Sequence, residues 1–479
     1  MKDLQTPIRP LGEHWGAVVL AAGKGTRMYS QRPKVLMELL GEPVLGYVLD
    51  SLEPLFGENI TVVIGHEADL VRGACAGRSC RFAHQEQQLG TGHALQVAWE
   101  SLAASGIRKL LVINGDTPLV TAQDVAAFVE YGEEADLAFL TVSLRDPGAF
   151  GRVVRSNGKV NAIIEAKDFD PEMHGPTTGE INAGLYLMDM TRVGPLLDKL
   201  TDDNASGEYY ITDLVAHGLD AGLRVEGVLA AVAGTAEDYD VLRMLGINSP
   251  VELVRAEARL AESRAQEALN TGVLVRWPES VRIGPHAVVE PGAEITGPCE
   301  IYGRSVIRSG ARVESHCVIV DSTVDAGTSV HSFSHLQSAS VGPGCSVGPY
   351  ARLRPGAVLE EHSKVGNFVE VKKATLGPGA KASHLTYLGD AAIGAKVNIG
   401  AGTITCNYDG KNKHLTTIEE GSFIGSNTAL VAPVTVGAHA LVAAGSVITR
   451  DVPENALAVA RCRQTVLPGR GTMPDDETS

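Results

Sequence analysis

With 479 residues, the chain exceeds the ~250 to 300 residues at which a single hydrophobic core stops growing, so we expect two domains or one domain with a repeat array. The 41 lysines and arginines against 57 aspartates and glutamates give a net charge of −16, which argues against nucleic-acid binding. The seven cysteines lack a CxxC pair, and no stretch approaches the ~18 apolar residues of a membrane span. We therefore expect reduced thiols, no membrane partner and a cytoplasmic location.

The first half of the chain, from Trp15 to about Asn248, alternates short apolar runs with longer amphipathic ones. GAVVLAA, ITVVIG and KLLVING predict strands, and VLGYVLDSL and GHALQVAWESLAA predict helices. This alternation indicates an open, Rossmann-like α/β sheet, in which ligands bind at the carboxyl ends of the strands. The segments AAGKGTRM and NGDTPLV fall at two such ends.

Residues suited to phosphate binding follow these predicted strand ends. AAGKGTRM offers small residues, backbone N–H groups and the cations Lys24 and Arg27. Gly-x-Gly alone also suits a tight turn, and the segment matches neither the dinucleotide-binding nor the Walker pattern. In RPKVLMEL a proline precedes Lys34, and in NGDTPLV Asp116 follows a strand, where it could equally cap the turn. Together the segments favour a site for a phosphorylated small molecule.

The segment 249–272, SPVELVRAEARLAESRAQEALNTG, predicts one helix that connects the two halves. Leu253 and Leu260 belong to an apolar stripe interleaved with glutamates and arginines, Ser249 supplies an N-cap and Gly272 ends the helix. We expect this helix to act as a strut between two folded units.

From about Val281 onward an aliphatic residue recurs every six positions, with occasional slips of one residue. One inward-pointing apolar residue per short segment, with glycine or polar turns between segments, predicts a parallel β-solenoid with a stacked aliphatic core. This fold also accounts for the 53 glycines, which exceed average usage. The repeat positions are Ile283, Val289, Ile295, Ile301, Ile307, Val313, Ile319, Val324, Val330, Leu336, Val341, Val347, Leu353, Leu359, Val365, Val371, Ile393, Ile399, Ile418, Ile424, Leu430, Val436, Val442 and Ile448.

Irregular segments of the solenoid carry its candidates for chemistry. Arg352, Arg354, Lys372 and Lys373 form a basic group that suits a sugar phosphate, although it also fits a solvated charged face. TITCNYDGKNKH breaks the six-residue rhythm and predicts a loop that projects from the scaffold. His384, in SHLTYLGD, is a candidate base, although a lone histidine more often belongs to the solenoid wall.

The motifs of the first half resemble those of the sugar nucleotidyltransferases, and in particular of the N-acetylglucosamine 1-phosphate uridyltransferases. LAAGKGTRM, PKVL, LGTGHA, GDTPL, FGRVVR, IIEAKD, EINAG, GEYYITD and LGIN carry this resemblance. It implies uridylyl transfer from UTP to N-acetylglucosamine 1-phosphate, with Lys34 and Arg27 as catalytic cations and Mg²⁺ held by Asp116 and Asn248. The implied UTP and sugar contacts are Leu20, Ala21, Ala22, Gly23, Lys34, Gln85, Gly90, Thr91, Asn114, Gly115, Asp116, Gly151, Glu165, Asn182 and Asn248.

The second half resembles the acetyltransferase domain of the same bifunctional family, which makes UDP-N-acetylglucosamine for bacterial peptidoglycan and lipopolysaccharide. SHLTYLGD and NIGAGTITCNYDG carry this resemblance. It implies that His384 is the general base, that acetyl-CoA is the donor, and that the solenoid is a left-handed parallel β-helix of hexapeptide repeats that forms a homotrimer. The implied amino-sugar contacts are Arg354, Lys372, Tyr387 and Asn398, and the implied acetyl-CoA contacts are Ala401, Asn407, Tyr408, Ser426, Ala444 and Arg461.

We therefore expect an α/β nucleotidyltransferase domain at 1–248, the linker helix at 249–272, and a β-helix acetyltransferase domain at 273–479 with a flexible C-terminal tail. One alternative is a single-activity nucleotidyltransferase whose solenoid only assembles oligomers or acylates another sugar. The other is a non-enzymatic regulator built from similar domains. The presence of His384 argues against the first alternative, and the presence of Lys34 and Asp116 argues against the second.

Overall fold

The computed structural model describes residues 8–230 and 242–471, and the chain divides into two compact units, Met1–Leu260 and Ala261–Ser479. The division falls within helix α9 (Pro250–Asn270). The helix has the predicted cap, because the N–H of Glu252 donates to Ser249 Oγ at 3.3 Å and the N–H of Ser249 donates to the Glu252 carboxylate at 3.1 Å. The domain limits at 248 and 272, and the role of the helix as a strut, stay predictions. The end of the predicted flexible tail, 472–479, lies outside the described residues.

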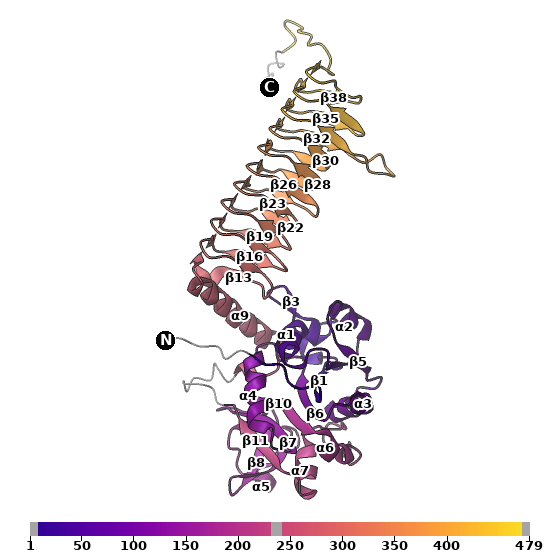
Figure 1. The fold of residues 1–479 in the computed structure, drawn as a ribbon, viewed down its shortest axis with the longest axis vertical. Coiled ribbons are helices and arrows are strands. Elements are labelled where there is room, and N and C mark those ends of the chain that lie inside the picture. The colour runs from indigo at the N-terminus through magenta and orange to yellow at the C-terminus, as the bar shows by residue number, and fades with distance from the viewer. Residues whose placement is uncertain (1–7, 231–241, 472–479) are drawn as a thin grey trace, which may run out of the picture. The chain divides into compact units, whose positions relative to one another are not determined.

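A nine-stranded sheet forms the centre of the N-terminal unit, in the order β11-β7-β10-β6-β1-β4-β5 with the β8–β9 hairpin beside β10 (Figure 1). Strands β1, β4, β5 and β6 are parallel, whereas β10 runs antiparallel to β6 and β7. The strands are β1 (Trp15–Leu20), β4 (Ile60–Ile64), β5 (Arg81–His84), β6 (Lys109–Asn114), β7 (Leu137–Ser143), β8 (Arg152–Ser156), β9 (Lys159–Ile164), β10 (Glu180–Asp189) and β11 (Val225–Leu229), with a small pair β2 (Glu38–Leu39) and β3 (Glu42–Pro43).

Helices cover both faces of this sheet. Successive residues of a strand point to opposite faces, so each strand contributes side chains to two cores. Val19 of β1 packs in one core with α1 and α4, and its neighbour Val18 packs in the other core with α3, α6 and α7. The alternation read from the sequence is therefore confirmed as an α/β fold. The helices are α1 (Val44–Phe56), α2 (Ala68–Ala74), α3 (Thr91–Ala104), α4 (Ala122–Gly132), α5 (Pro171–His174), α6 (Met190–Leu197) and α7 (Asp213–Asp220), with 3-10 turns η1 (Thr26–Met28), η2 (Lys34–Leu36) and η3 (Leu242–Met244).

The ends of β1 and β6 bring two predicted binding segments side by side. The two strands are parallel neighbours in register, and Leu20 at the end of β1 pairs with Asn114 at the end of β6. The segments that follow, 21–28 and 115–120, must therefore leave the sheet at the same edge. This is the edge at which α/β sheets bind ligands.

The C-terminal unit is a solenoid of parallel strands with three short segments per turn, and the residues of its core are those predicted by the six-residue period. Ile283, Ile301 and Ile319 pair in register from one turn to the next, and Ile319 pairs in the same way with Leu336. Fewer residues separate Ile319 from Leu336 than separate the earlier pairs. A slip in the six-residue period therefore marks a turn of the solenoid that is shorter. Of the predicted positions, Val289 is only partly buried and the others are buried in one core.

The sequence pattern left gaps that the structure fills. Leu376, Ala382 and Leu388 occupy the core between Val371 and Ile393, each in register with a core residue of the previous turn. Five-residue steps on both sides of this stretch hid the period, and alanine is too small to mark it. Thr405 occupies the next core position that the pattern missed. Its buried hydroxyl donates a hydrogen bond to the Gly389 carbonyl at 3.0 Å.

The predicted projecting loop is present at 407–414, where the turn lengthens. Ala382 pairs with Ile399 and Ile399 pairs with Ile424, and the second of these steps is longer than the first by the length of the loop. The loop folds back on itself through a bridge between Tyr408 and Lys413. Asp409 braces it, because its carboxylate accepts from the N–H of Asn412 at 2.6 Å and of Lys411 at 2.8 Å. This is the hairpin that projects from the stack near β32 in Figure 1.

No helix within 8–230 or 242–471 has the length and hydropathy to cross a membrane.

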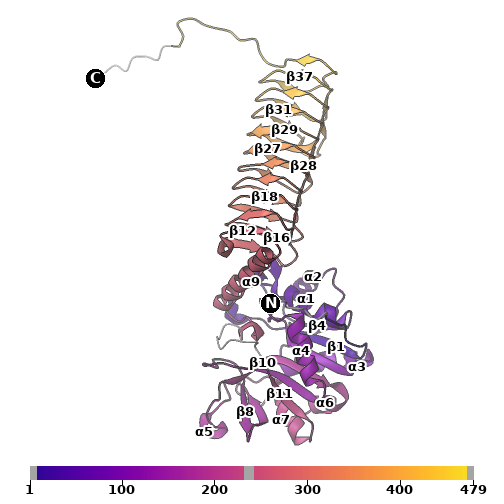
Figure 2. The same cartoon turned by 60° about the vertical axis from the view of Figure 1, so that its left-hand side comes forward.

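The solenoid strands form two sheets in the described residues, and Figure 2 shows β27, β29 and β31 in successive turns. The first sheet contains β12 (Leu274–Arg276), β15 (Glu294–Thr296), β18 (Arg312–Val313), β21 (Ser329–Val330), β24 (Ser346–Val347), β27 (Lys364–Asn367), β29 (Lys381–His384), β31 (Asn398–Ile399), β34 (Phe423–Ile424), β37 (Leu441–Val442) and β39 (Leu457–Ala458). The second contains β13 (Val281–Ile283), β14 (Val288–Val289), β16 (Cys299–Tyr302), β17 (Val306–Ile307), β19 (Cys317–Val320), β20 (Thr323–Val324), β22 (His335–Gln337), β23 (Ser340–Val341), β25 (Arg352–Leu353), β26 (Ala357–Leu359), β28 (Glu370–Leu376), β30 (Tyr387–Ile393), β32 (Ile404–Cys406), β33 (Thr416–Ile418), β35 (Ala429–Val431), β36 (Val434–Val436) and β38 (Val447–Ile448).

Candidate active sites

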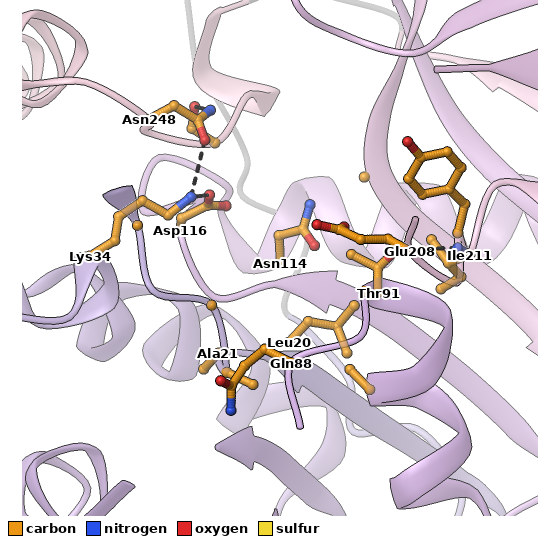
Figure 3. Close-up of a pocket in the computed structure, with 18 of the residues that line it drawn as sticks. Leu20, Ala21, Lys34, Gln88, Thr91, Asn114, Asp116, Glu208, Ile211 and Asn248 are labelled. Carbon is orange, nitrogen blue, oxygen red and sulfur yellow. Dashed lines mark hydrogen bonds and ion pairs between the residues drawn. The ribbon is translucent and has the colours of Figure 1, made fainter. Parts of the chain in front are cut away.

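A cavity of about 830 Å³ opens at the carboxyl ends of β1 and β6 in the N-terminal unit (Figure 3). All but one of the residues predicted for the N-terminal site line it, although they come from segments as distant in sequence as Leu20 and Asn248. These lining residues are Leu20, Ala21, Ala22, Gly23, Arg27, Lys34, Gln85, Gly90, Thr91, Asn114, Asp116, Gly151, Glu165, Asn182 and Asn248.

The exception is Gly115, which holds the two strand ends together behind the cavity. Its N–H donates to the Leu20 carbonyl at 2.9 Å. A Cβ at this position would lie 3.2 Å from that same oxygen. Gln88, Glu208 and Tyr210 are among the polar lining residues that were not predicted. Gln88 directly precedes LGTGHA, and Glu208 and Tyr210 lie within GEYYITD, but only the fold shows which residues of these segments face the cavity.

Cations and oxygen ligands meet at one side of the cavity. Figure 3 shows Lys34 reaching between Asp116 and Asn248; its ammonium pairs with the Asp116 carboxylate and donates to Asn248 Oδ1 at 3.1 Å. Arg27 also donates to Asn248 Oδ1, at 2.8 Å. Gly246 is required beside this cluster, because a Cβ there would lie 2.4 Å from Asp116 Oδ1. Only one of these two cations is paired with the Asp116 carboxylate, which leaves positive charge for an anionic ligand.

The donor set at this side fits a small hard cation. Asp116 is 8% exposed, and its Oδ1 atom has no hydrogen-bond partner among the described residues. A carboxylate oxygen and an amide oxygen are ligands that Mg²⁺ accepts, with waters and substrate phosphates completing its shell. No group of three or more His, Cys, Asp or Glu side chains in the described part of the chain could hold a metal alone. Any divalent ion here would therefore take further ligands from water or from the substrate.

Another side of the cavity is formed where α3 begins. Gly90 has φ +109°, and a Cβ there would lie 2.6 Å from the Tyr209 carbonyl, so only glycine fits. Gln85 donates to the Gly90 carbonyl at 3.0 Å, and the N–H of Ile211 donates to Thr91 Oγ1 at 3.2 Å. The LGTGHA and GEYYITD motifs are thereby locked against each other, 120 residues apart in sequence.

A half-buried carboxylate, that of Glu165, lies at a third side of the cavity. Burial raises the pKa of the Glu165 carboxyl above its ordinary value, and the hydrogen bond from Thr212, at 3.1 Å, partly opposes this shift. Asn182 lies nearby in the lining; its Oδ1 accepts from the N–H of Gly184 and its Nδ2 donates to Tyr186 at 2.7 Å. Fixed carboxyl and carboxamide groups of this kind suit the hydroxyls of a sugar.

In the solenoid, the predicted base and three of the predicted acetyl-CoA contacts lie in one row at a single corner. Backbone hydrogen bonds between successive turns define the row. Leu385, next to His384, accepts from Gly402, Ala401 accepts from Asn427, and Ser426 accepts from Gly445. The row is His384, Ala401, Ser426 and Ala444, with Arg461 exposed after the last of these turns.

The predicted sugar-phosphate contacts include a cluster of like charges. The charge of Lys413, and then that of Arg354, lowers the pKa of the Lys372 ammonium below its ordinary value. Lys413 belongs to the projecting loop and was not predicted, because nothing in the sequence shows that the loop returns over β28. Arg354 also forms an ion pair with Glu370 at 2.7 Å. An anion placed among these cations would relieve their repulsion.

The remaining predicted solenoid residues are divided between the sheets. Tyr387 lies on β30, beside the charged cluster, whereas Asn398 lies on β31 in the other sheet. Among the described residues, no hydrogen bond joins the side chain of Asn398 to this cluster. Asn407 donates to the Asp390 carboxylate, and Tyr408 is 60% exposed on the loop. One copy of the chain thus presents these groups along an open surface.

Fold and sites together define a sugar nucleotidyltransferase joined to a hexapeptide-repeat transferase. The family model for the MobA-like NTP transferase domain matches residues 17–163, and that for the bacterial transferase hexapeptide (six repeats) matches residues 415–450. Relatives named "Bifunctional protein GlmU" are similar over nearly the whole chain. That of Nitratidesulfovibrio vulgaris (strain DP4) is 58% identical, with 95% of this chain and 98% of the relative covered. That of Oleidesulfovibrio alaskensis is 57% identical, with 94% and 96% covered.

The chain belongs to this GlmU family of bifunctional enzymes. It is a uridyltransferase and a glucosamine-1-phosphate acetyltransferase of UDP-N-acetylglucosamine synthesis, which uses UTP and acetyl-CoA. Its solenoid is the left-handed parallel β-helix expected for hexapeptide repeats. The alternatives of an inert solenoid and of a non-enzymatic regulator are therefore set aside.

Proposed function

We propose that the two reactions are divided between the two units. Glucosamine 1-phosphate is acetylated at the row of residues that contains His384, and the product then receives uridylyl in the N-terminal cavity. The observation that carries this division is that each unit holds its own cationic cluster, Lys34 with Arg27 in one and Lys372 with Lys413 in the other. Each cluster suits one phosphorylated substrate.

In the N-terminal cavity, the chemistry brings two anions together. Lys34 and Arg27 neutralise the UTP phosphates, and the sugar phosphate attacks the α-phosphorus in line, releasing pyrophosphate. Glu165 and Asn182 hold the sugar, while Gln85, Gly90 and Thr91 hold the uridine. Asp116 and Asn248 would hold Mg²⁺, which supplies Lewis-acid neutralisation of the phosphate charge when bound. The unpartnered Asp116 oxygen supports this choice of ligand.

In the solenoid, His384 takes the proton from the glucosamine amine as the amine attacks the thioester carbonyl. The N–C bond forms, the C–S bond breaks, and the departing thiolate receives a proton. No nucleophilic cysteine is needed, so we assign the half-buried Cys406 to support of the loop. Arg354, Lys372, Tyr387 and Asn398 hold the sugar phosphate. Ala401, Asn407, Tyr408, Ser426, Ala444 and Arg461 hold acetyl-CoA.

We further propose that the enzyme is a cytoplasmic homotrimer assembled through the β-helix, without a membrane or nucleic-acid partner. An aromatic corner supports the assembly: His316, Phe333, Tyr350 and Phe368 stack in successive turns with ring centroids 4.6, 4.9 and 5.3 Å apart. These residues all have positive φ, and Phe333, Tyr350 and Phe368 are about half exposed. Bulky residues in that conformation are strained, and exposed rings favour a covering partner.

Two assays test the division of labour. Pyrophosphate release from UTP and N-acetylglucosamine 1-phosphate measures the first site, and CoA release from acetyl-CoA and glucosamine 1-phosphate measures the second. Substitution of Asp116 should silence only the former reaction, and substitution of His384 only the latter. If either variant, while well folded, loses both activities, the division is wrong. Sedimentation of the wild type and of Tyr350→Ser tests the assembly: a monomeric wild type, or an unchanged Tyr350→Ser variant, would contradict it.

A further inference from the structure

His384 is held by a side chain from the previous turn of the solenoid. Its Nδ1 atom lies 2.6 Å from Oδ1 of Asn367. The two residues are direct register partners on β27 and β29, which lie in successive turns in Figure 2. Gly366 permits this approach, because a Cβ there would lie 2.0 Å from the Ser383 carbonyl. In the described residues, no hydrogen bond involves Nε2 of His384.

We propose that Asn367 is a positioning residue for acetyl transfer, and that its carboxamide oxygen fixes the tautomer of His384. An oxygen can only accept, so Nδ1 must carry the proton and Nε2 presents its lone pair. Only that tautomer can take the proton from the substrate amine at Nε2 as the N–C bond forms. The same proton then passes to the thiolate released when the C–S bond breaks. This inference rests on the proposed role of His384 as the base.

The location of Asn367 suits this role in two ways. It lies in the turn before His384, whereas the residues proposed to hold acetyl-CoA lie in the turns after it, so it can orient the ring without occupying the donor site. Its backbone carbonyl also accepts from the N–H of Leu385 at 3.0 Å, which ties the segment after the base to the same residue. A neutral carboxamide orients the ring without adding the negative charge by which a carboxylate would stabilise the imidazolium.

The test uses the full-length enzyme and two substitutions. Asn367→Leu, similar in size but without an acceptor, should lower kcat for CoA release on the order of 10- to 100-fold and leave KM for acetyl-CoA nearly unchanged. Asn367→Asp restores an acceptor and should recover part of kcat. In ¹⁵N-histidine NMR spectra, with the His384 signals assigned by their loss in His384→Gln, the wild type should show the Nδ1–H tautomer, and Asn367→Leu a mixture.

Ser332→Ala is the matched control, because Ser332 occupies the same corner two turns earlier and bonds Glu314 instead. Ser332→Ala should change neither kcat for CoA release nor the NMR signals of His384. Uridylyl transfer should be normal in every variant. An Nε2–H tautomer in the wild type, or an undiminished kcat in Asn367→Leu, would overturn the positioning role alone. An active His384→Gln enzyme would instead overturn the proposed base, so the two failures are distinguishable.

Discussion

The two units build their sites in opposite ways. The N-terminal site is a cavity enclosed by residues from distant parts of its unit, such as Leu20 and Asn248, which meet because the parallel strands β1 and β6 end at one edge. The proposed solenoid site is an open row of residues such as His384 and Ala401, which are neighbours because they are one turn apart. A cavity can contact its ligands from several sides, whereas an open row can accept a long donor and a second subunit.

This difference predicts different sensitivities. The cavity depends on close contacts between segments far apart in sequence, so it should respond to changes of backbone fit as well as of charge. The row in the solenoid depends on the spacing of successive turns and on the side chains that project from them, so it should respond mainly to changes of those side chains. Four substitutions, in order of decreasing expected effect, test this contrast.

Removing the Asp116 carboxylate from the N-terminal cationic cluster should have the largest effect. In Asp116→Ala, Lys34 loses its ion pair and the proposed metal site loses its charged ligand. We expect pyrophosphate release to fall on the order of 10³-fold or more, with CoA release unchanged. The same variant should bind Mn²⁺ more weakly in a titration followed by electron paramagnetic resonance. Normal Mn²⁺ binding would contradict the proposed ligand.

Removing the proposed base should have the next largest effect. We expect His384→Ala to lower kcat for CoA release by roughly 10²- to 10³-fold, which lies within the usual contribution of a general base. Because His384 is exposed at a corner, the fold should tolerate the change. Thiol release followed with a chromogenic disulfide measures the reaction, and unimpaired uridylyl transfer by the same sample serves as the control.

A test of enclosure is Gly90→Ala. The new Cβ would lie 2.6 Å from the Tyr209 carbonyl at φ +109°, so the α3 end of the cavity must shift. We expect KM for UTP to rise about tenfold and stability to fall by about 1 to 3 kcal/mol. Gly106→Ala is the control, because it also has positive φ (+80°) but meets no atom within 4 Å. If both variants raise KM equally, the contact with Tyr209 is not the cause.

The smallest effect should come from the projecting loop. Loss of the charge in Lys413→Met should raise KM for glucosamine 1-phosphate by roughly fivefold. The neighbouring charge of Lys413 lowers the pKa of Lys372, so in the wild type Lys372 loses its proton, and phosphate binding weakens, at a lower pH than for an ordinary lysine. Lys413→Met should move that weakening to higher pH. Lys411→Met, in the same loop, should leave the pH dependence of KM unchanged.

The comparison also shows what each kind of sequence pattern could predict. The six-residue period specified most of the solenoid core, because every turn repeats one local rule. It missed Leu376 and Leu388, which lie beside five-residue steps, and it missed Ala382 and Thr405, which replace a larger aliphatic residue. In the N-terminal unit, the motifs named the lining residues, yet they also included Gly115, which packs behind the cavity. Motif membership does not reveal which way a residue faces.

The sequence by itself determined the α/β class, the repeat, the helix capped by Ser249 and the family resemblance, because these follow from local periodicity and from the order of motifs. Only the tertiary structure decided that Lys34 bridges Asp116 and Asn248, that Lys413 approaches Lys372, and that Asn367 holds His384. These contacts join side chains 17 to 214 residues apart. Their geometry depends on strand register and loop path, which no local pattern encodes.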